Sequence, residues 1–115
     1  MTPRTIDAQP GPIPVELERT AVVMIDMQRD FLLEGGFGET LGNDVSLLWK
    51  AVAPCRALLA AARRKGVLVI HTREGHRPDL SDAPKAKLER GEPKLRIGSA
   101  GPMGRILVRG EAGHD

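Results

Sequence analysis

The sequence predicts an α/β fold built on a strand–helix–strand unit. Two apolar segments, residues 21–27 and 67–72, have the continuous hydrophobicity of strands that are covered on both faces. Between them, residues 53–65 repeat apolar side chains at helical spacing. Strand, helix and strand joined by short connections indicate two parallel strands with a right-handed crossover.

The first part of the chain divides into an arm and the start of the domain. Residues 1–19 contain several prolines and no hydrophobic period, so we expect an extended arm, laid over a surface or left free. The domain then occupies residues 20–115. Its first segment, AVVMIDM, predicts a buried parallel strand with Asp26 at its carboxyl end. Residues 34–44, EGGFGETLGND, predict a glycine-rich loop.

The helix predicted over residues 53–65 has signals at both ends. Pro54 suits the first helical position, and Gly66 suits the position just past the end. Its apolar stripe consists of Cys55, Leu58, Leu59 and Ala62. Residues 45–51 form a separate short helical turn, because a proline interrupts a continuous helix.

The second strand, residues 67–72 (VLVIHT), is followed by a long loop that begins at Gly75. Residues 105–109, RILVR, predict a short strand after that loop. Two strands and one helix cannot cover both faces of a parallel sheet. We therefore expect residues 20–115 to be the N-terminal portion of a larger domain.

The composition is that of an ordinary soluble protein, with 41% hydrophobic and 28% charged residues among 115. No apolar run approaches the about 20 residues of a membrane span, and no apolar segment marks a signal peptide. We expect a cytoplasmic protein without a membrane partner. A net charge of +2 and few aromatic side chains argue against nucleic-acid binding. The single cysteine, Cys55, lies on the apolar stripe of the helix and is expected to be an inert small hydrophobe.

Polar residues gather after both predicted strands, where ligands bind in open α/β sheets. The first group is Asp26, Gln28, Asp30 and Phe31, and the second is His71, Arg73, Glu74 and His76. Asp26 is the sharpest signal, because a carboxylate inside an apolar run is costly to desolvate unless it is used or paired. It is either a catalytic carboxylate or a group that hydrogen-bonds a neighbouring loop.

Other functional interpretations of these loops are weaker. His71, His76 and Asp79 do not have a spacing that ensures a convergent metal site, so we expect a hydrogen-bonded loop and no metal. Arg73 and Arg77 either hold a carboxylate or carbonyl group of a substrate or pair with Glu74, Asp79 or a neighbouring subunit. The glycines of 34–44 lack the dinucleotide-binding spacing, and no cofactor is expected.

Three segments resemble a known family. Residues 20–32, TAVVMIDMQRDFL, resemble the first strand of the isochorismatase-like cysteine hydrolases, whose members share an I-D-M-Q-x-D-F pattern. Residues 69–87 and 97–115 are similar to the biuret amidohydrolase subgroup. The resemblance implies a three-layer, Rossmann-like α/β fold with a mostly parallel sheet, assembled as a homo-oligomer.

The resemblance also implies an Asp–Lys–Cys triad that cleaves C–N bonds. Asp26 matches the aspartate that accepts the thiol proton, Phe31 matches an aromatic residue near the substrate, and Gln28 lies in the same motif. Arg73 is a further candidate for substrate binding. In the family the lysine and cysteine lie beyond the position of Asp115, and no residue here matches them. We therefore expect this chain to be inactive alone.

Two functions follow as hypotheses. The leading one is hydrolysis of a small amide or ureido compound such as biuret, without a cofactor or metal. The alternative is a non-catalytic remnant or subunit that pairs with another chain through an exposed sheet edge.

Overall fold

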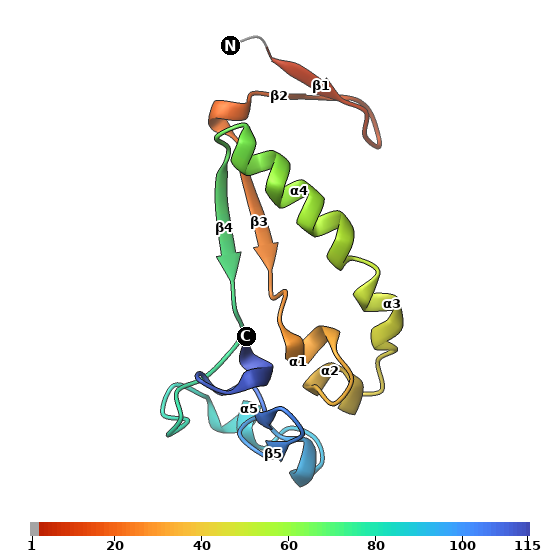
Figure 1. The fold of residues 1–115 in the computed structure, drawn as a ribbon. Helices are drawn as coiled ribbons and strands as arrows, with labels where there is room; N and C mark the ends of the chain where they lie inside the picture. The colour runs from red at the N-terminus through yellow and green to blue at the C-terminus, as the bar shows by residue number, and fades with distance from the viewer. Residues whose placement is uncertain (1–2) are drawn as a thin grey trace.

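A computed structural model describes residues 3–115, which are organised around one strand–helix–strand unit (Figure 1). Its parts are β3 (Ala21–Ile25), α4 (Val52–Arg64) and β4 (Leu68–Thr72). The two strands run parallel, in a register that pairs Ala21 with Leu68 and Ile25 with Thr72. The two predicted strands, their parallel direction and the helix between them are confirmed.

The N-terminal arm carries a short hairpin that the sequence pattern does not reveal. β1 (Arg4–Ile6) and β2 (Ile13–Val15) pair antiparallel, and the 3-10 helix η1 (Leu17–Arg19) connects them to β3. The hairpin extends from the amino-terminal end of β3, far from the C-terminus (Figure 1). The prediction of an arm over 1–19 also covers residues 1 and 2, which lie outside the described part.

The ends of α4 differ slightly from the prediction. Its N-cap is Ala51, so Pro54 lies in the first turn rather than at the first helical position. The first turn tolerates proline because its N–H groups have no acceptor within the helix. The separate helical turn is confirmed as α3 (Val45–Trp49), and Gly66 follows the helix with a φ of 67°. Leu58 is exposed, while the other three members of the predicted stripe are at least partly buried.

The prediction that both faces of the strands are covered is wrong for this chain. In the part that the structure describes, α4 packs along the two-stranded sheet and Met24 is buried. Alternate positions on the two strands are 43% to 66% exposed: Val23, Ile25, Leu68 and Ile70. The result is a small mixed α/β structure with three short two-stranded sheets among the described residues. One apolar face of the β3–β4 sheet is exposed.

The helical segment Val45–Arg64, which joins α3 and α4, meets the length and composition criteria of a membrane span. Lys50 and Arg56 interrupt its apolar runs, which is why the sequence alone predicts no such segment. Core helices of soluble proteins and signal sequences meet the same criteria, so one such helix is weak evidence and assigns no membrane location.

The glycine-rich segment 34–44 contains a helix where a loop is predicted. α1 (Arg29–Leu32) is followed by α2 (Phe37–Thr40), which packs against it. Gly36 allows this close approach, because a Cβ atom there would lie 2.5 Å from the carbonyl oxygen of Asp30. Gly36 and Gly38 therefore serve the contact between α1 and α2, whereas Gly35 and Gly42 adopt positive φ values in the turns on either side of α2.

The remaining chain folds around the end of the sheet as short elements. They are α5 (Lys85–Leu88), η2 (Pro93–Leu95), β5 (Ala100–Gly101), β6 (Gly104–Arg105) and η3 (Ala112–His114). The predicted strand over 105–109 is wrong beyond Arg105, since the chain turns at Leu107, which has a φ of 52°. Leu107 instead joins Ile97 and Ile106 in a buried apolar cluster against Phe31.

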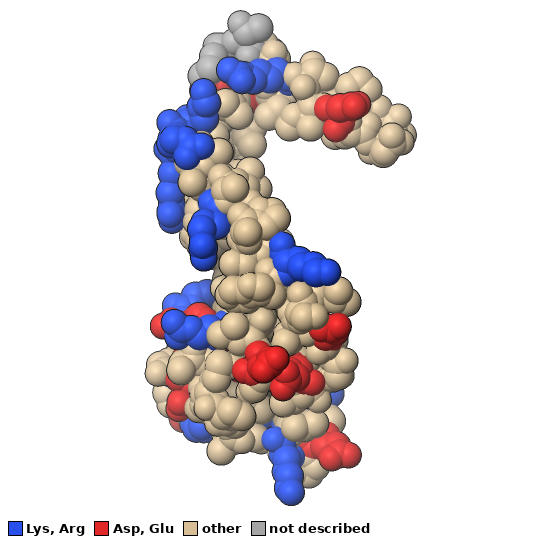
Figure 2. All heavy atoms as spheres, turned by 45° about the vertical axis from the view of Figure 1, so that its right-hand side comes forward, with Lys and Arg blue, Asp and Glu red and all other residues tan. Residues whose placement is uncertain are grey.

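Charge is unevenly distributed over the surface. In the face shown in Figure 2, acidic and basic side chains are mixed around the C-terminal elements, whereas the end that carries the arm is mostly basic. Arg63 and Arg64 lie in the last turn of α4, where the helix dipole favours cations.

Candidate functional site

Asp26 lies where the chain leaves the carboxyl end of β3. Its φ of 52° is unusual for a residue other than glycine, and such conformations cluster at functional sites. The Asp26 N–H donates to the carbonyl oxygen of Thr72 at 3.2 Å and to its Oγ1 at 3.1 Å. The Thr72 hydroxyl donates in turn to Asp26 Oδ1 at 2.7 Å. Thr72 thus orients the carboxylate, and no described residue hydrogen-bonds its Oδ2.

Gln28 is 2% exposed and connects three parts of the chain. Its Oε1 accepts the Glu74 N–H at 2.8 Å, and its Nε2 donates to the carbonyl oxygens of Glu74 at 2.9 Å and His114 at 2.7 Å. These bonds join the exit of β4 and the C-terminal segment to α1. The side chain does not line the cavity described below.

Arg73 lies against the C-terminal segment. Its guanidinium forms an ion pair with Asp115 and donates to the His114 carbonyl oxygen at 3.3 Å. It also contacts His114 Nδ1 at 3.2 Å. Burial and the nearby Arg73 cation lower the pKa of His114 below its ordinary value. Arg73 therefore pairs with an acidic residue, but the partner is Asp115 and not the predicted Glu74 or Asp79.

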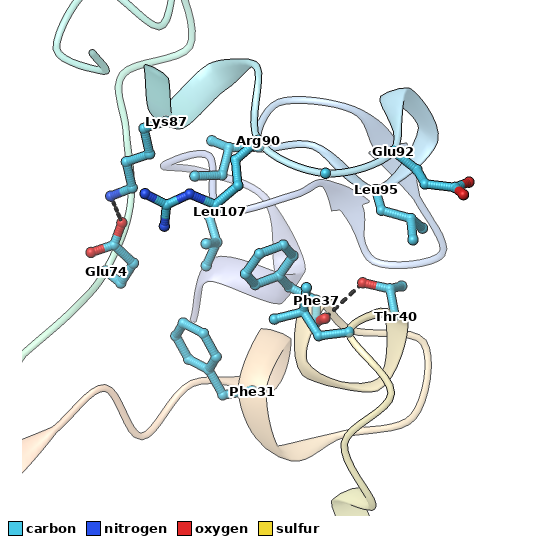
Figure 3. A pocket seen from close by; sticks show the side chains of 12 residues that line it. Phe31, Phe37, Thr40, Glu74, Lys87, Arg90, Glu92, Leu95 and Leu107 are labelled. Carbon is cyan, nitrogen blue, oxygen red and sulfur yellow. Dashed lines mark hydrogen bonds and ion pairs between the residues drawn. The ribbon is translucent and has the colours of Figure 1, made fainter. Parts of the chain in front are cut away.

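A cavity of about 520 Å³ lies between α1 and α2 on one side and residues 90–97 on the other (Figure 3). The aromatic rings of Phe31 and Phe37 form part of its wall, edge to face, with centroids 6.3 Å apart. Leu107 lines it from the buried cluster. Of the residues predicted to bind substrate, the structure brings Phe31 to this cavity but not Gln28 or Arg73. Asp26 is also absent from its lining.

An ionic network occupies one end of the cavity. Lys87 Nζ contacts the Glu74 carboxylate, which lies 3.2 Å from Nε2 of the buried His76. His76 Nδ1 is 3.4 Å from Asp82 on its other side. The pKa of Glu74 is lowered mainly by the hydrogen bond from Lys87. The pKa of Asp82 is lowered mainly by the hydrogen bond from the Arg77 backbone N–H. The network fixes the loop after β4 to α5.

The described residues, 3–115, contain no group of three His, Cys, Asp or Glu side chains that could hold a metal ion. His76 faces Glu74 and Asp82, whereas Asp79 accepts the backbone N–H of Ser81. Cys55 is a free thiol, half-buried on α4.

The sequence indicates Asp30 as a polar residue after the first strand but not its role, and it assigns no role to Lys87 or Arg90. Asp30, which is 3% exposed, accepts the N–H of Leu107 at 3.1 Å and thereby holds the turn in the buried cluster. Lys87 and Arg90 line the cavity from a segment that the sequence assigns to a loop. Lys87 lies in α5 and Arg90 follows the C-cap residue Glu89, and no pattern in the sequence indicates that both side chains reach the cavity.

Comparison with known proteins gives a family match over most of the chain. A model of the isochorismatase domain matches residues 20–109. A ureidoacrylate amidohydrolase RutB of Agrobacterium fabrum is 38% identical over 69% of this chain and 35% of the relative. RutB proteins of Caulobacter segnis and Pantoea ananatis are 29% and 28% identical over 92% and 97% of this chain, and each is covered to 46%. The chain thus spans about a third to a half of the length of these relatives.

Proposed function

The chain belongs to the isochorismatase family, and from that premise we propose that it forms part of a hydrolase of small amide or ureido compounds. The relatives named ureidoacrylate amidohydrolase support an amide or ureido substrate class. Biuret, which the resemblance of residues 69–87 suggests, is a second candidate substrate. In this proposal the working enzyme is a homo-oligomer.

The orientation of Asp26 by Thr72 is the observation that carries the proposal. A carboxylate that keeps one oxygen free at the end of a parallel strand is suited to accept a proton. Asp26 would take the proton of a cysteine thiol, because the thiolate is the nucleophile. The thiolate would attack the substrate carbonyl, and the C–N bond would break as the leaving nitrogen takes the proton held by Asp26. Water would then cleave the thioester, which releases the acid and restores the thiol.

The cysteine and lysine of this mechanism are matched by no residue of the chain. Cys55 lies on α4, and the lysine that lines the cavity, Lys87, is paired with Glu74. The proposal therefore assigns both groups to further polypeptide, and the relatives' greater length is consistent with that assignment.

The other predicted site residues take supporting roles in this proposal. Phe31 would contact the substrate, since its ring lines the cavity. Gln28 and Arg73 would hold the surrounding segments in place, because their polar atoms are engaged by Glu74, His114 and Asp115.

One observation favours the alternative of a non-catalytic pairing subunit. The open face of the β3–β4 sheet exposes Ile25 and Leu68 to 66% and 62%, and exposed apolar patches favour association, although the alternative pairs through the sheet edge rather than through this face. The two functions differ in one respect that can be measured, because only the hydrolase requires Asp26 to act on a substrate.

The test uses a fusion of residues 1–115 to the part of the Pantoea ananatis relative that follows its matched segment, because that match covers 97% of this chain. Ammonia release from ureidoacrylate and from biuret is followed with a coupled glutamate dehydrogenase assay. We expect turnover by the fusion and none by the chain alone. A folded fusion, verified by circular dichroism, that releases no ammonia from either compound would overturn the hydrolase. Thiol-dependent turnover by the chain alone would overturn the assignment of the triad.

A further inference from the structure

The cavity between α1–α2 and residues 90–97 has two chemically different regions. Phe31, Phe37 and Leu107 give it an apolar wall, and its volume of about 520 Å³ is in the range of small-molecule sites. Lys87, Glu74 and the Arg90 guanidinium lie together at one end, whereas the Glu92 carboxylate lies at the opposite end (Figure 3).

The charges at the first end do not cancel. Lys87 and Glu74 form an ion pair, with 32% and 33% of their side-chain surfaces exposed. The Glu74 carboxylate is shared further with the buried His76, at 3.2 Å. Arg90 forms no hydrogen bond or ion pair with any residue that the structure describes. Arg90 is exposed to solvent, so its guanidinium is hydrated, has no partner among the described residues beside the apolar wall and is open to a ligand.

Arg90 is the group at this end that can receive a ligand. A guanidinium presents a planar fork of donors that matches the two oxygens of a carboxylate, and such charge-assisted pairs are the stronger hydrogen bonds. The rings of Phe31 and Phe37 would contact the carbon chain of the same ligand. A neutral ligand would form no ion pair with Arg90, whose exposed guanidinium would stay hydrated, whereas a carboxylate would gain that pair.

We propose that this cavity binds a small carboxylate with a short carbon chain, and that Arg90 determines its preference for the acid. The identification of this ligand as the substrate rests on the proposed function; the binding itself does not. If the hydrolase holds, its substrate is an amido or ureido acid rather than a neutral compound such as biuret.

The test measures binding without turnover, so that its failure differs from failure of the hydrolase. The complete chain, labelled with ¹⁵N, is titrated with 3-ureidopropionate and with its neutral counterpart 3-ureidopropionamide, and shifts of the backbone amides of 90–97 are fitted. We expect the acid to bind about tenfold more tightly or better than the amide.

Two variants separate the Arg90 site from general attraction between charges. Arg90→Gln is expected to reduce acid binding to the level of the amide and to leave amide binding unchanged. Lys85→Gln removes a charge from the exposed side of α5, where the side chain is 86% exposed, and is expected to leave both unchanged. Equal affinities for acid and amide, absence of binding by both, or equal losses in the two variants would each overturn the proposal.

Discussion

Replacing Gln28 with methionine is the sharpest test of how the site is held together. The substitution keeps the length of the side chain but removes the three hydrogen bonds to the backbone of Glu74 and His114. Because Gln28 is 2% exposed, water cannot replace these bonds without opening the structure. Each such bond contributes about 1 kcal/mol net, so the free energy of unfolding should fall by about 3 kcal/mol.

That loss is large, because the free energy of unfolding of a typical domain is only about 5–15 kcal/mol. Urea unfolding can be followed by the fluorescence of Trp49, the single tryptophan. Gln9→Met is the matched control, because Gln9 is exposed in the arm and should change the free energy by less than about 0.5 kcal/mol. If Gln28→Met lost no more than this control, the assignment of Gln28 as a structural connector would be refuted.

Two further predictions concern the buried cluster and the C-terminal segment. Asp30→Ala leaves the buried Leu107 N–H without its acceptor and should lower the free energy of unfolding by about 2 kcal/mol. Urea unfolding measures this loss, and the exposed Asp7→Ala is the control, for which little change is expected. Equal effects of these two variants would contradict the role of Asp30. The pKa of His114 is lower in the folded chain than in the unfolded chain, so the unfolded chain binds a proton at His114 more tightly. The free energy of unfolding should therefore fall progressively as the pH drops below about 6.5. In His114→Gln, the free energy of unfolding should depend less on pH between 7.5 and 5.5 than in the unmodified chain. The same dependence in both proteins would contradict the lowered pKa of His114.

The strand–helix–strand unit could be predicted because its signals are local. Apolar runs, the position of Gly66 and the helical spacing around Ala62 each depend on neighbouring residues. The partners of Arg73 and Gln28 could not be predicted, since Asp115 and His114 are more than forty and eighty residues away. These contacts depend on how the C-terminal segment returns to α1.

The errors also have physical causes. In segment 34–44, glycines normally indicate a loop, but here Gly36 permits α2 to pack against the backbone of Asp30. In segment 105–109, the apolar run correctly indicates burial, but Leu107 adopts a positive φ and turns the chain into the cluster. Hydrophobicity alone does not distinguish a buried turn from a buried strand.

The central claim is that Asp26 is the proton acceptor of a cysteine hydrolase, and Asp26→Asn in the fusion with the Pantoea ananatis segment tests it most directly. The asparagine keeps the size of the side chain and can still accept the Thr72 hydroxyl bond, but it cannot take the thiol proton. We predict that kcat for ammonia release falls by about 10²-fold or more, whereas Asp7→Asn in the arm leaves it unchanged. An Asp26→Asn fusion that keeps its circular dichroism spectrum and at least a third of its kcat would contradict the account.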